Sequence, residues 1–170
     1  MIQRLIKHWV YGGFIALCFY ADIDLLPAKP AEPASFSSPE SLVADLYKQE
    51  NAGHSPFFQT KQRGLLDRYF TAQLSCLIWK DTVTSQAHGE VGALDGDPLY
   101  DAQDMEITHF ALRAAPAHLG KGEATVIASF KNMGHKTKVI YSLLLTKTGW
   151  RISDITYGDG RTLVGILSEK

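Results

Sequence analysis

The apolar positions of residues 38–84 recur with the spacing of α-helices. Ser38 followed by Pro39 is typical of a helix start, because a serine hydroxyl can accept from a free backbone N–H and proline fits the first turn. Apolar residues then continue at helical spacing to Gly53, where this helix is expected to end. A second amphipathic helical region is predicted over residues 60–84. If this region consists of two helices, the break between them is expected at Gly64.

After residue 104 the apolar period changes to that of strands. Strands are predicted over residues 105–112, 123–130, 138–146 and 150–157, with a short helix over 161–168. The middle two strands are joined by a predicted hairpin, in which Asn132 and Gly134 are the residues suited to the left-handed conformation. On the next strand Val139, Tyr141, Leu143 and Leu145 are expected to share one face. Helices followed by hairpin-linked strands predict an α+β fold, with the helices on one face of an antiparallel sheet.

The first 26 residues have a different pattern. Arg4 and Lys7 precede an uncharged stretch of 13 residues, 9–21, and Asp22 and Asp24 follow it. This order is typical of a secretory signal, and the apolar stretch is shorter than the roughly 20 residues that a spanning helix needs. We therefore predict a signal peptide or N-terminal anchor over residues 1–26, a linker rich in Pro, Ala and Ser over 27–37, and one domain over 38–170. Lipidation at Cys18 and an N-terminal helix packed on the domain are the alternatives.

Composition narrows the class of protein. The chain has 170 residues, which suits one domain, and its 17 basic and 18 acidic residues give a net charge of -1. This balance offers no basic surface for nucleic acid. There are two cysteines, so a domain without its signal keeps only Cys76 and has no disulfide framework. The apolar neighbours of Cys76 predict a buried thiol.

Residues 95–104 hold four carboxylates in ten positions, and a second acidic point ends the last predicted strand. Carboxylates this dense can bind calcium, but the loop lacks the glycine and the final glutamate of an EF-hand. The six histidines show no paired ligand spacing, so neither a metal site nor a cofactor is predicted, and no catalytic residue is assigned. The alternative to a functional role of residues 95–104 is a solvated loop whose aspartates cap turns. The candidate ligand- or partner-binding residues are Asp97, Tyr100, Asp101, Gln103, Asp104, Tyr157 and Asp159.

Several short motifs resemble an uncharacterised family of small bacterial envelope proteins and lipoproteins, the domain of unknown function 3828. They lie at residues 38–42, 97–104, 124–132, 149–155 and 157–160, so the resemblance covers residues 38–168. It implies a cone-shaped fold similar to nuclear transport factor 2, also described as cystatin-like, with helices on a curved antiparallel sheet. It also implies export with a signal or lipid anchor, and a periplasmic location.

Export without catalytic spacing favours a non-enzymatic envelope protein that binds a protein partner or a small ligand. One specific form is an immunity or inhibitor protein that presents Asp97, Asp101, Asp104 and Asp159 to a basic enzyme cleft. The alternative is a small enzyme or ligand carrier with a pocket between sheet and helices, using His109 or Asp104 with Tyr157. Membrane contact is expected only through the N-terminal segment, and a homodimer formed through the sheet is a further expectation.

Overall fold

The computed structural model describes residues 36–115 and 122–169, all within one compact unit of the chain, Ala31–Lys170. The predicted signal or anchor and nearly all of the predicted linker lie outside the described residues. None of the described helices combines the length and the apolar character needed to span a bilayer.

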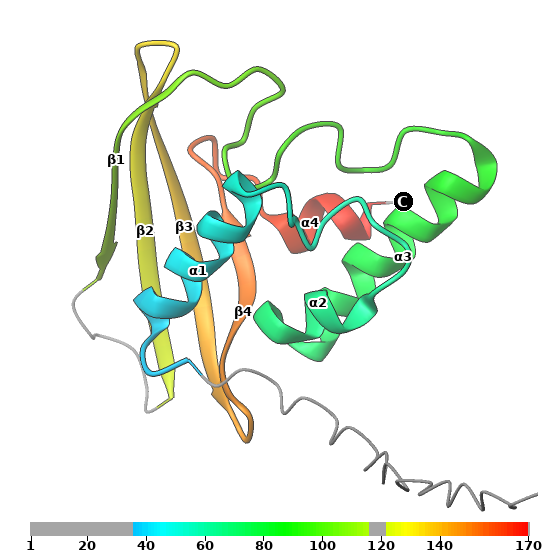
Figure 1. The fold of residues 1–170 in the computed structure, drawn as a ribbon, viewed down its shortest axis with the longest axis horizontal. Helices are drawn as coiled ribbons and strands as arrows, with labels where there is room; N and C mark the ends of the chain where they lie inside the picture. Colours follow the sequence, from blue (N-terminus) through cyan, green and yellow to red (C-terminus); the bar gives the residue numbers. More distant parts are fainter. Residues whose placement is uncertain (1–35, 116–121, 170) are drawn as a thin grey trace, which may run out of the picture. The chain divides into compact units, whose positions relative to one another are not determined.

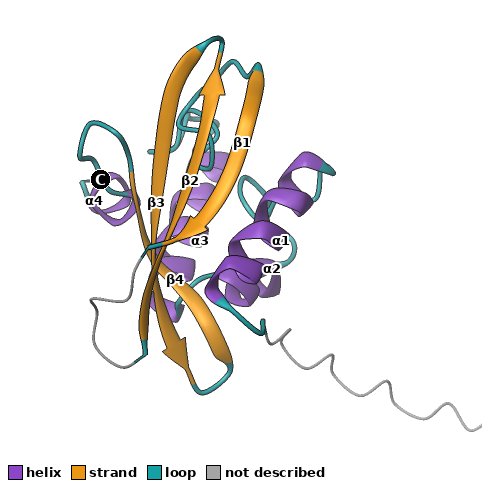
Figure 2. Ribbon diagram, turned by 90° about the vertical axis from the view of Figure 1, so that its left-hand side faces the viewer, coloured by secondary structure: helices purple, strands orange, loops and turns teal. Residues whose placement is uncertain are grey.

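Three of the described helices precede the strands along the chain, and a short fourth helix follows them. The helices are α1 (Pro39–Asn51), α2 (Arg63–Tyr69), α3 (Ala72–His88) and α4 (Leu163–Ser168). The strands are β1 (Ile107–Ala114), β2 (Glu123–Asn132), β3 (His135–Thr146) and β4 (Gly149–Thr156), and they form one antiparallel sheet in the order β1-β2-β3-β4. The helices lie on one side of the curved sheet (Figure 1), and the other side is open (Figure 2). The predicted α+β fold, with helices packed on a curved antiparallel sheet, is confirmed.

The first helix begins as predicted. The Ser38 hydroxyl accepts from the Ser41 backbone N–H at 3.1 Å, and the Ser41 hydroxyl accepts from the Ser38 N–H at the same distance. This reciprocal capping satisfies two backbone donors at the start of the helix. The helix ends at Asn51, two residues before the predicted Gly53.

The break in the second helical region was predicted at the wrong residue. Gly64 lies inside α2, and the chain leaves the helix at Phe70 and Thr71. Phe70 bridges to Ile152 of β4, and the Thr71 N–H donates to the Ile152 carbonyl at 2.8 Å. The Thr71 side chain then caps α3. This pairing with the edge of the sheet therefore sets the break between α2 and α3. The helix propensities of the local residues do not predict it.

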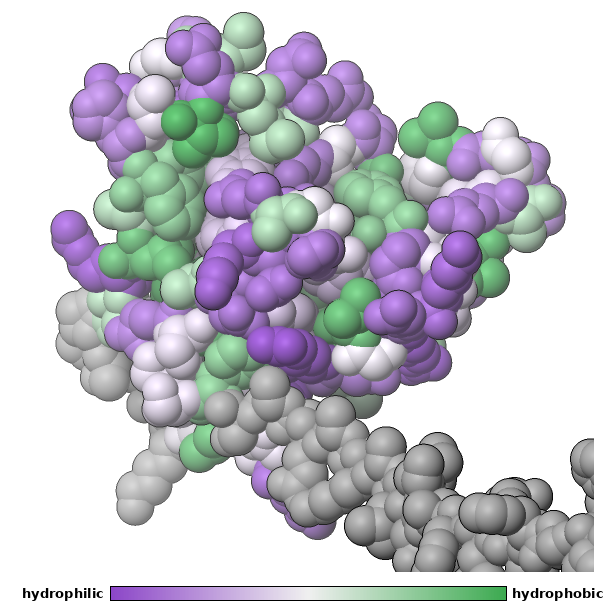
Figure 3. Space-filling model, viewed as in Figure 1, coloured by the Kyte–Doolittle hydropathy of each residue, from purple (hydrophilic) through white to green (hydrophobic). Residues whose placement is uncertain are grey.

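The core forms between the helices and the inner face of the sheet. Alternate residues of β2 and β3 are buried there as predicted: Val126, Ala128, Phe130, Val139, Tyr141 and Leu143. Leu145 differs from the prediction and is 54% exposed, because it lies beside the β3–β4 turn, opposite Trp150. The edge strand β1 is also incompletely covered. Phe110 packs on Phe130 yet stays 41% exposed, and apolar side chains gather over β1 in Figure 3.

Cys76 is exposed, so the prediction of a buried thiol was wrong. The buried stripe of α3 runs through Leu74, Ser75, Ile78 and Thr82. Cys76 lies two residues after Leu74, which at 3.6 residues per turn is about 200° around the helix axis. Ser75 occupies the inner position instead and donates to Asp67 at 2.5 Å.

The β2–β3 hairpin has a two-residue turn formed by Met133 (φ 49°) and Gly134 (φ 82°). Asn132 had been expected to take the left-handed conformation, but it ends β2 instead. A two-residue turn of this kind needs positive φ at both central positions, whatever residue stands there. The Asn132 side chain is freed to accept from the Glu106 N–H at 2.8 Å and to donate to the Asp104 carbonyl at 2.9 Å.

Candidate functional site

The acidic loop is held to the core by buried tyrosines. The Tyr47 hydroxyl of α1 donates to the Leu99 carbonyl at 2.7 Å, and the Tyr157 hydroxyl after β4 donates to the Pro98 carbonyl at 3.2 Å. Tyr141 of β3 donates in turn to Tyr47 at 2.8 Å. Burial raises the pKa of all three phenols, so they stay protonated donors. The loop backbone is therefore fixed against α1 and the sheet.

Asp97 shapes the loop from within. Its carboxylate accepts from the N–H groups of Leu99 at 2.7 Å and Tyr100 at 3.3 Å, which makes a turn of the type that aspartate favours. Its backbone N–H donates to the Ala102 carbonyl at 2.8 Å and closes the loop. Burial raises the pKa of Asp97, and the two backbone N–H donors partly oppose that rise.

Arg161 joins the loop to the end of the sheet. Its Nη2 lies 3.0 Å from Asp101 of the loop, and its Nε donates to Asp159 of the turn after β4. The guanidinium also lies 5.5 Å from the centre of the Tyr157 ring. The hydrogen bond from Arg161 lowers the pKa of Asp159, and the same bond raises the pKa of Arg161. One cation thus neutralises two carboxylates from segments far apart in the sequence.

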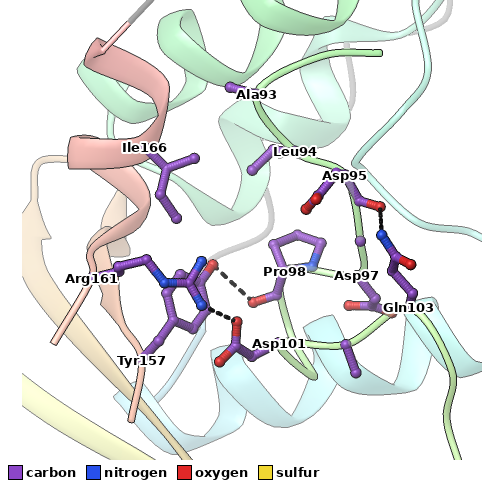
Figure 4. Close-up of a pocket in the computed structure, with 12 residues that line it drawn as sticks. Ala93, Leu94, Asp95, Asp97, Pro98, Asp101, Gln103, Tyr157, Arg161 and Ile166 are labelled. Carbon is purple, nitrogen blue, oxygen red and sulfur yellow. Dashed lines mark hydrogen bonds and ion pairs between the residues drawn. The ribbon is translucent and has the colours of Figure 1, made fainter. Parts of the chain in front are cut away.

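A pocket of about 320 Å³ opens between the loop and this arginine. The loop forms one side of it, and Tyr157, Arg161 and Ile166 of α4 form the other (Figure 4). The ionisable lining groups of the loop are the carboxylates of Asp95, Asp97 and Asp101. Gln103 also lines the pocket and donates to the Asp95 carbonyl at 3.2 Å. The lining therefore carries more negative than positive charge and suits a positively charged group.

The structure brings together part of the predicted set of site residues. Asp97, Asp101, Gln103 and Tyr157 line the pocket. Tyr100 instead turns inward, where its hydroxyl donates to Asn51 at 2.7 Å.

Two other predicted residues lie outside the lining. Asp104 is exposed away from the pocket, and Asp159 reaches the site only through Arg161. The four aspartates expected to offer an acidic patch have different partners: Asp97 accepts from the loop backbone, Asp101 and Asp159 share one guanidinium, and Asp104 does not line the pocket.

Sequence reasoning missed Arg161 and left Asp95 out of the site. The available signal was the position of Arg161 directly after the Gly-Asp-Gly turn, where a cation could meet the nearby carboxylates. Its pairing with Asp101 spans 60 positions and depends on tertiary structure.

The grouping expected for an enzyme is not assembled. His109 has a φ of 55° at the irregularity in β1 pairing between Thr108 and Ala111, is exposed, and lines a separate hollow on the sheet. Asp104 is also exposed, and neither residue lines the pocket with Tyr157. Across residues 36–115 and 122–169, no three His, Cys, Asp or Glu side chains are grouped so that they could hold a metal ion.

No protein-family profile matches the chain, and no curated protein matches it. Among solved structures, it is similar to a phospholipid-binding protein from Ralstonia solanacearum in complex with a phospholipid, with a TM-score of 0.33 and 13% identity. That match covers 75% of this chain and 69% of the other. A likeness at this TM-score supports no conclusion about function, and the resemblance to the envelope family stays a prediction.

Proposed function

We propose that the domain is the non-enzymatic binding module of an exported envelope protein. Its pocket beside the acidic loop accepts a positively charged group, supplied by a protein partner or a small ligand. In the more specific form, an immunity or inhibitor protein, a basic side chain of the inhibited enzyme enters this pocket. Periplasmic location and an N-terminal signal or anchor are part of the same proposal.

The observation that carries the proposal is the charge balance of the pocket. Three lining carboxylates, Asp95, Asp97 and Asp101, face one guanidinium, and that guanidinium is already paired with Asp101 and Asp159. Both backbone N–H groups bond Oδ1 of Asp97, so an incoming cation can approach its Oδ2 and the carboxylate of Asp95 without displacing Arg161. Carboxylates lining a concave surface also raise the local concentration of cations.

The polar groups of the pocket also favour binding over catalysis. The Tyr157 hydroxyl donates to a backbone carbonyl, and Asp97 accepts from two backbone N–H groups. Two of the lining groups that acid–base chemistry could use are thus engaged in holding the loop. A nucleophile paired with a base within hydrogen-bond reach, which covalent catalysis requires, is not seen among the described lining residues.

The direct test is a titration of the full chain with spermidine, followed by the backbone amide signals in nuclear magnetic resonance. We expect saturable shifts confined to residues 93–103 and 157–161. Asp95→Asn should weaken binding about fivefold, since an exposed ion pair contributes up to ~1 kcal/mol. Asp104→Asn is the matched control, because that carboxylate is exposed on the same loop but does not line the pocket. Equal shifts at every exposed carboxylate would show ionic screening and contradict the proposal.

A second experiment separates a protein partner from a small ligand. The tagged full chain and its Asp95→Asn/Gln103→Ala variant are used to capture proteins from envelope fractions, which are then identified by mass spectrometry. A protein with a basic surface that is captured by the wild type and by Asp104→Asn, and lost with the double variant, supports the immunity or inhibitor form. Saturable spermidine binding with no such protein supports the ligand-carrier form.

A further inference from the structure

Three lysines are gathered on the open face of the sheet, near the β2–β3 hairpin. Lys131 of β2 lies directly opposite Lys136 of β3, and Ser129 lies opposite Lys138. Cross-strand partners project from the same face, and this face is opposite to the one that buries Phe130 and Val139. The helices cover the other face, so the face that carries these lysines is the open face of the sheet (Figure 2).

These lysines have no counter-ion within the described residues. None forms an ion pair, although Asp104 and Glu106 lie on the segment before β1. Like charges placed directly opposite each other on neighbouring strands destabilise a sheet. Together with His109 and Thr137 the lysines line a hollow of about 360 Å³. A hollow with this lining suits an anionic group such as a phosphate.

The tip of the same hairpin exposes apolar side chains. Met133 is 59% exposed and Met105 is 51% exposed. The Met133 N–H donates to the Glu106 carbonyl at 3.1 Å, which holds the segment of Met105 beside the turn. Met133 also has a φ of 49°, a conformation that costs a side-chain-bearing residue about 1–2 kcal/mol. An exposed apolar residue in a strained turn, flanked by lysines, has no explanation in the packing of the domain.

We propose that the β2–β3 hairpin binds the surface of a bilayer that contains anionic phospholipid. Lys131, Lys136 and Lys138 contact the headgroup phosphates, while Met133 and Met105 enter the interface. Exposed apolar groups beside cations are typical of interfacial binding, and each lysine near an anionic surface adds about 1 kcal/mol. An acidic protein would also attract the lysines, but its charge would not account for the two exposed methionines. A bilayer offers both anionic headgroups and an apolar interior, so the observations favour the bilayer.

This site is independent of the pocket at the acidic loop. It also adds a membrane contact to the one expected of the N-terminal segment. Because that segment would itself attach the full chain to vesicles, the test needs a signal from the hairpin alone. We would label Met133→Cys with an environment-sensitive dye in full-length protein carrying Cys18→Ser and Cys76→Ser. The matched control carries the dye on the native, exposed Cys76 of α3 in a Cys18→Ser chain.

With vesicles of phosphatidylcholine and phosphatidylglycerol, the dye at the hairpin should shift its emission to the blue and the dye on Cys76 should not. Added salt should reverse the shift. Lys131→Glu/Lys136→Glu should raise the lipid concentration for half-maximal shift at least about tenfold. No shift at the hairpin, an equal shift at Cys76, or the same shift with phosphatidylcholine alone would overturn the proposal. A shift produced by soluble polyglutamate but not by vesicles would overturn it in favour of an acidic protein.

Discussion

The Tyr141 hydroxyl of β3 donates a hydrogen bond to the Tyr47 hydroxyl of α1 at 2.8 Å, and both side chains are buried. Tyr47 in turn donates to the Leu99 carbonyl in the acidic loop. The sheet, the first helix and the loop are thereby joined by two consecutive hydrogen bonds within the core. Hydrogen bonds in such surroundings are strong, and polar groups left unpaired there are costly.

Removing the Tyr47 hydroxyl should therefore cost more stability than removing the Tyr141 hydroxyl. Tyr47→Phe leaves the Leu99 carbonyl without this donor and the Tyr141 hydroxyl without this acceptor, so we expect the free energy of unfolding to fall by about 2–4 kcal/mol. Tyr141→Phe removes one donor and leaves the Tyr47–Leu99 bond intact, so we expect a loss of about 1 kcal/mol. Urea denaturation measures the free energy of unfolding of both variants. Equal losses would contradict the arrangement in which Tyr47 links Tyr141 to the Leu99 carbonyl.

Gly96 should be intolerant of a side chain. A Cβ at this position would lie 2.9 Å from the Ala102 carbonyl oxygen, which belongs to the backbone and cannot move aside freely. We expect Gly96→Ala to destabilise the protein by about 1–3 kcal/mol and to weaken spermidine binding, because the loop must open. Gly158→Ala is the control, since nothing lies within 4 Å of its Cβ. If both variants unfold at the wild-type urea concentration, the close approach of the loop strands is contradicted.

Arg161→Gln should affect binding more than stability. Its ion pairs are half exposed, so we expect a loss of less than about 1 kcal/mol in the free energy of unfolding. Losing the positive charge of Arg161 from the pocket lining should raise spermidine affinity about fivefold. Arg63→Gln is the control, as Arg63 is similarly exposed and pairs with Asp67 outside the pocket. Calorimetric titration would distinguish the two variants, and unchanged affinity in Arg161→Gln would rule out a cation site there.

Asp97 and Asp159 should give opposite dependences of stability on pH. Burial raises the pKa of Asp97 in the folded state. Its contribution to stability is therefore fullest below the pKa of the unfolded state and is lost as pH rises through the pKa of the folded state. The hydrogen bond from Arg161 lowers the pKa of Asp159, so its contribution is present above the unfolded pKa and is lost as pH falls through the folded one.

Replacement by asparagine removes each titration. Relative to the wild type, Asp97→Asn should gain stability as pH rises above the usual aspartate value of 3.8. Asp159→Asn should be less stable than the wild type at neutral pH and should approach it as pH falls below 3.8. Thermal unfolding of the three proteins from acid to neutral pH would reveal the two trends, and parallel curves would contradict both assignments.

Most secondary structure could be predicted from the chain because it depends on near neighbours. The capped start of α1 and the alternation of β2 and β3 are local patterns, and both were found as predicted. The break between α2 and α3 was not local, since it depends on Thr71 bonding to Ile152. The exposure of Cys76 could have been found from the sequence, because the phase of the α3 stripe excludes it from the core.

The candidate site was predicted as the acidic stretch together with Tyr157 and Asp159 after the last strand. The chain alone showed that residues 95–104 are dense in carboxylates, and four of the seven predicted residues line the pocket. It did not show that Tyr100 turns into the core or that Arg161 pairs with Asp101. Acidic residues adjacent in sequence can face different partners, and which partner each meets depends on segments brought close by folding.

By itself the sequence determined the order and type of the elements, the α+β class and the acidic character of one loop, because short-range periodicity and composition are sufficient for these. Only the tertiary structure decided which carboxylates remain available to a ligand, which cation they share, and which lysines lie opposite each other on the sheet. Those properties depend on the ion pair of Arg161 with Asp101 and on the strand pairing that places Lys131 opposite Lys136. Such contacts form only once the strands have paired and the loop has been bonded to the core.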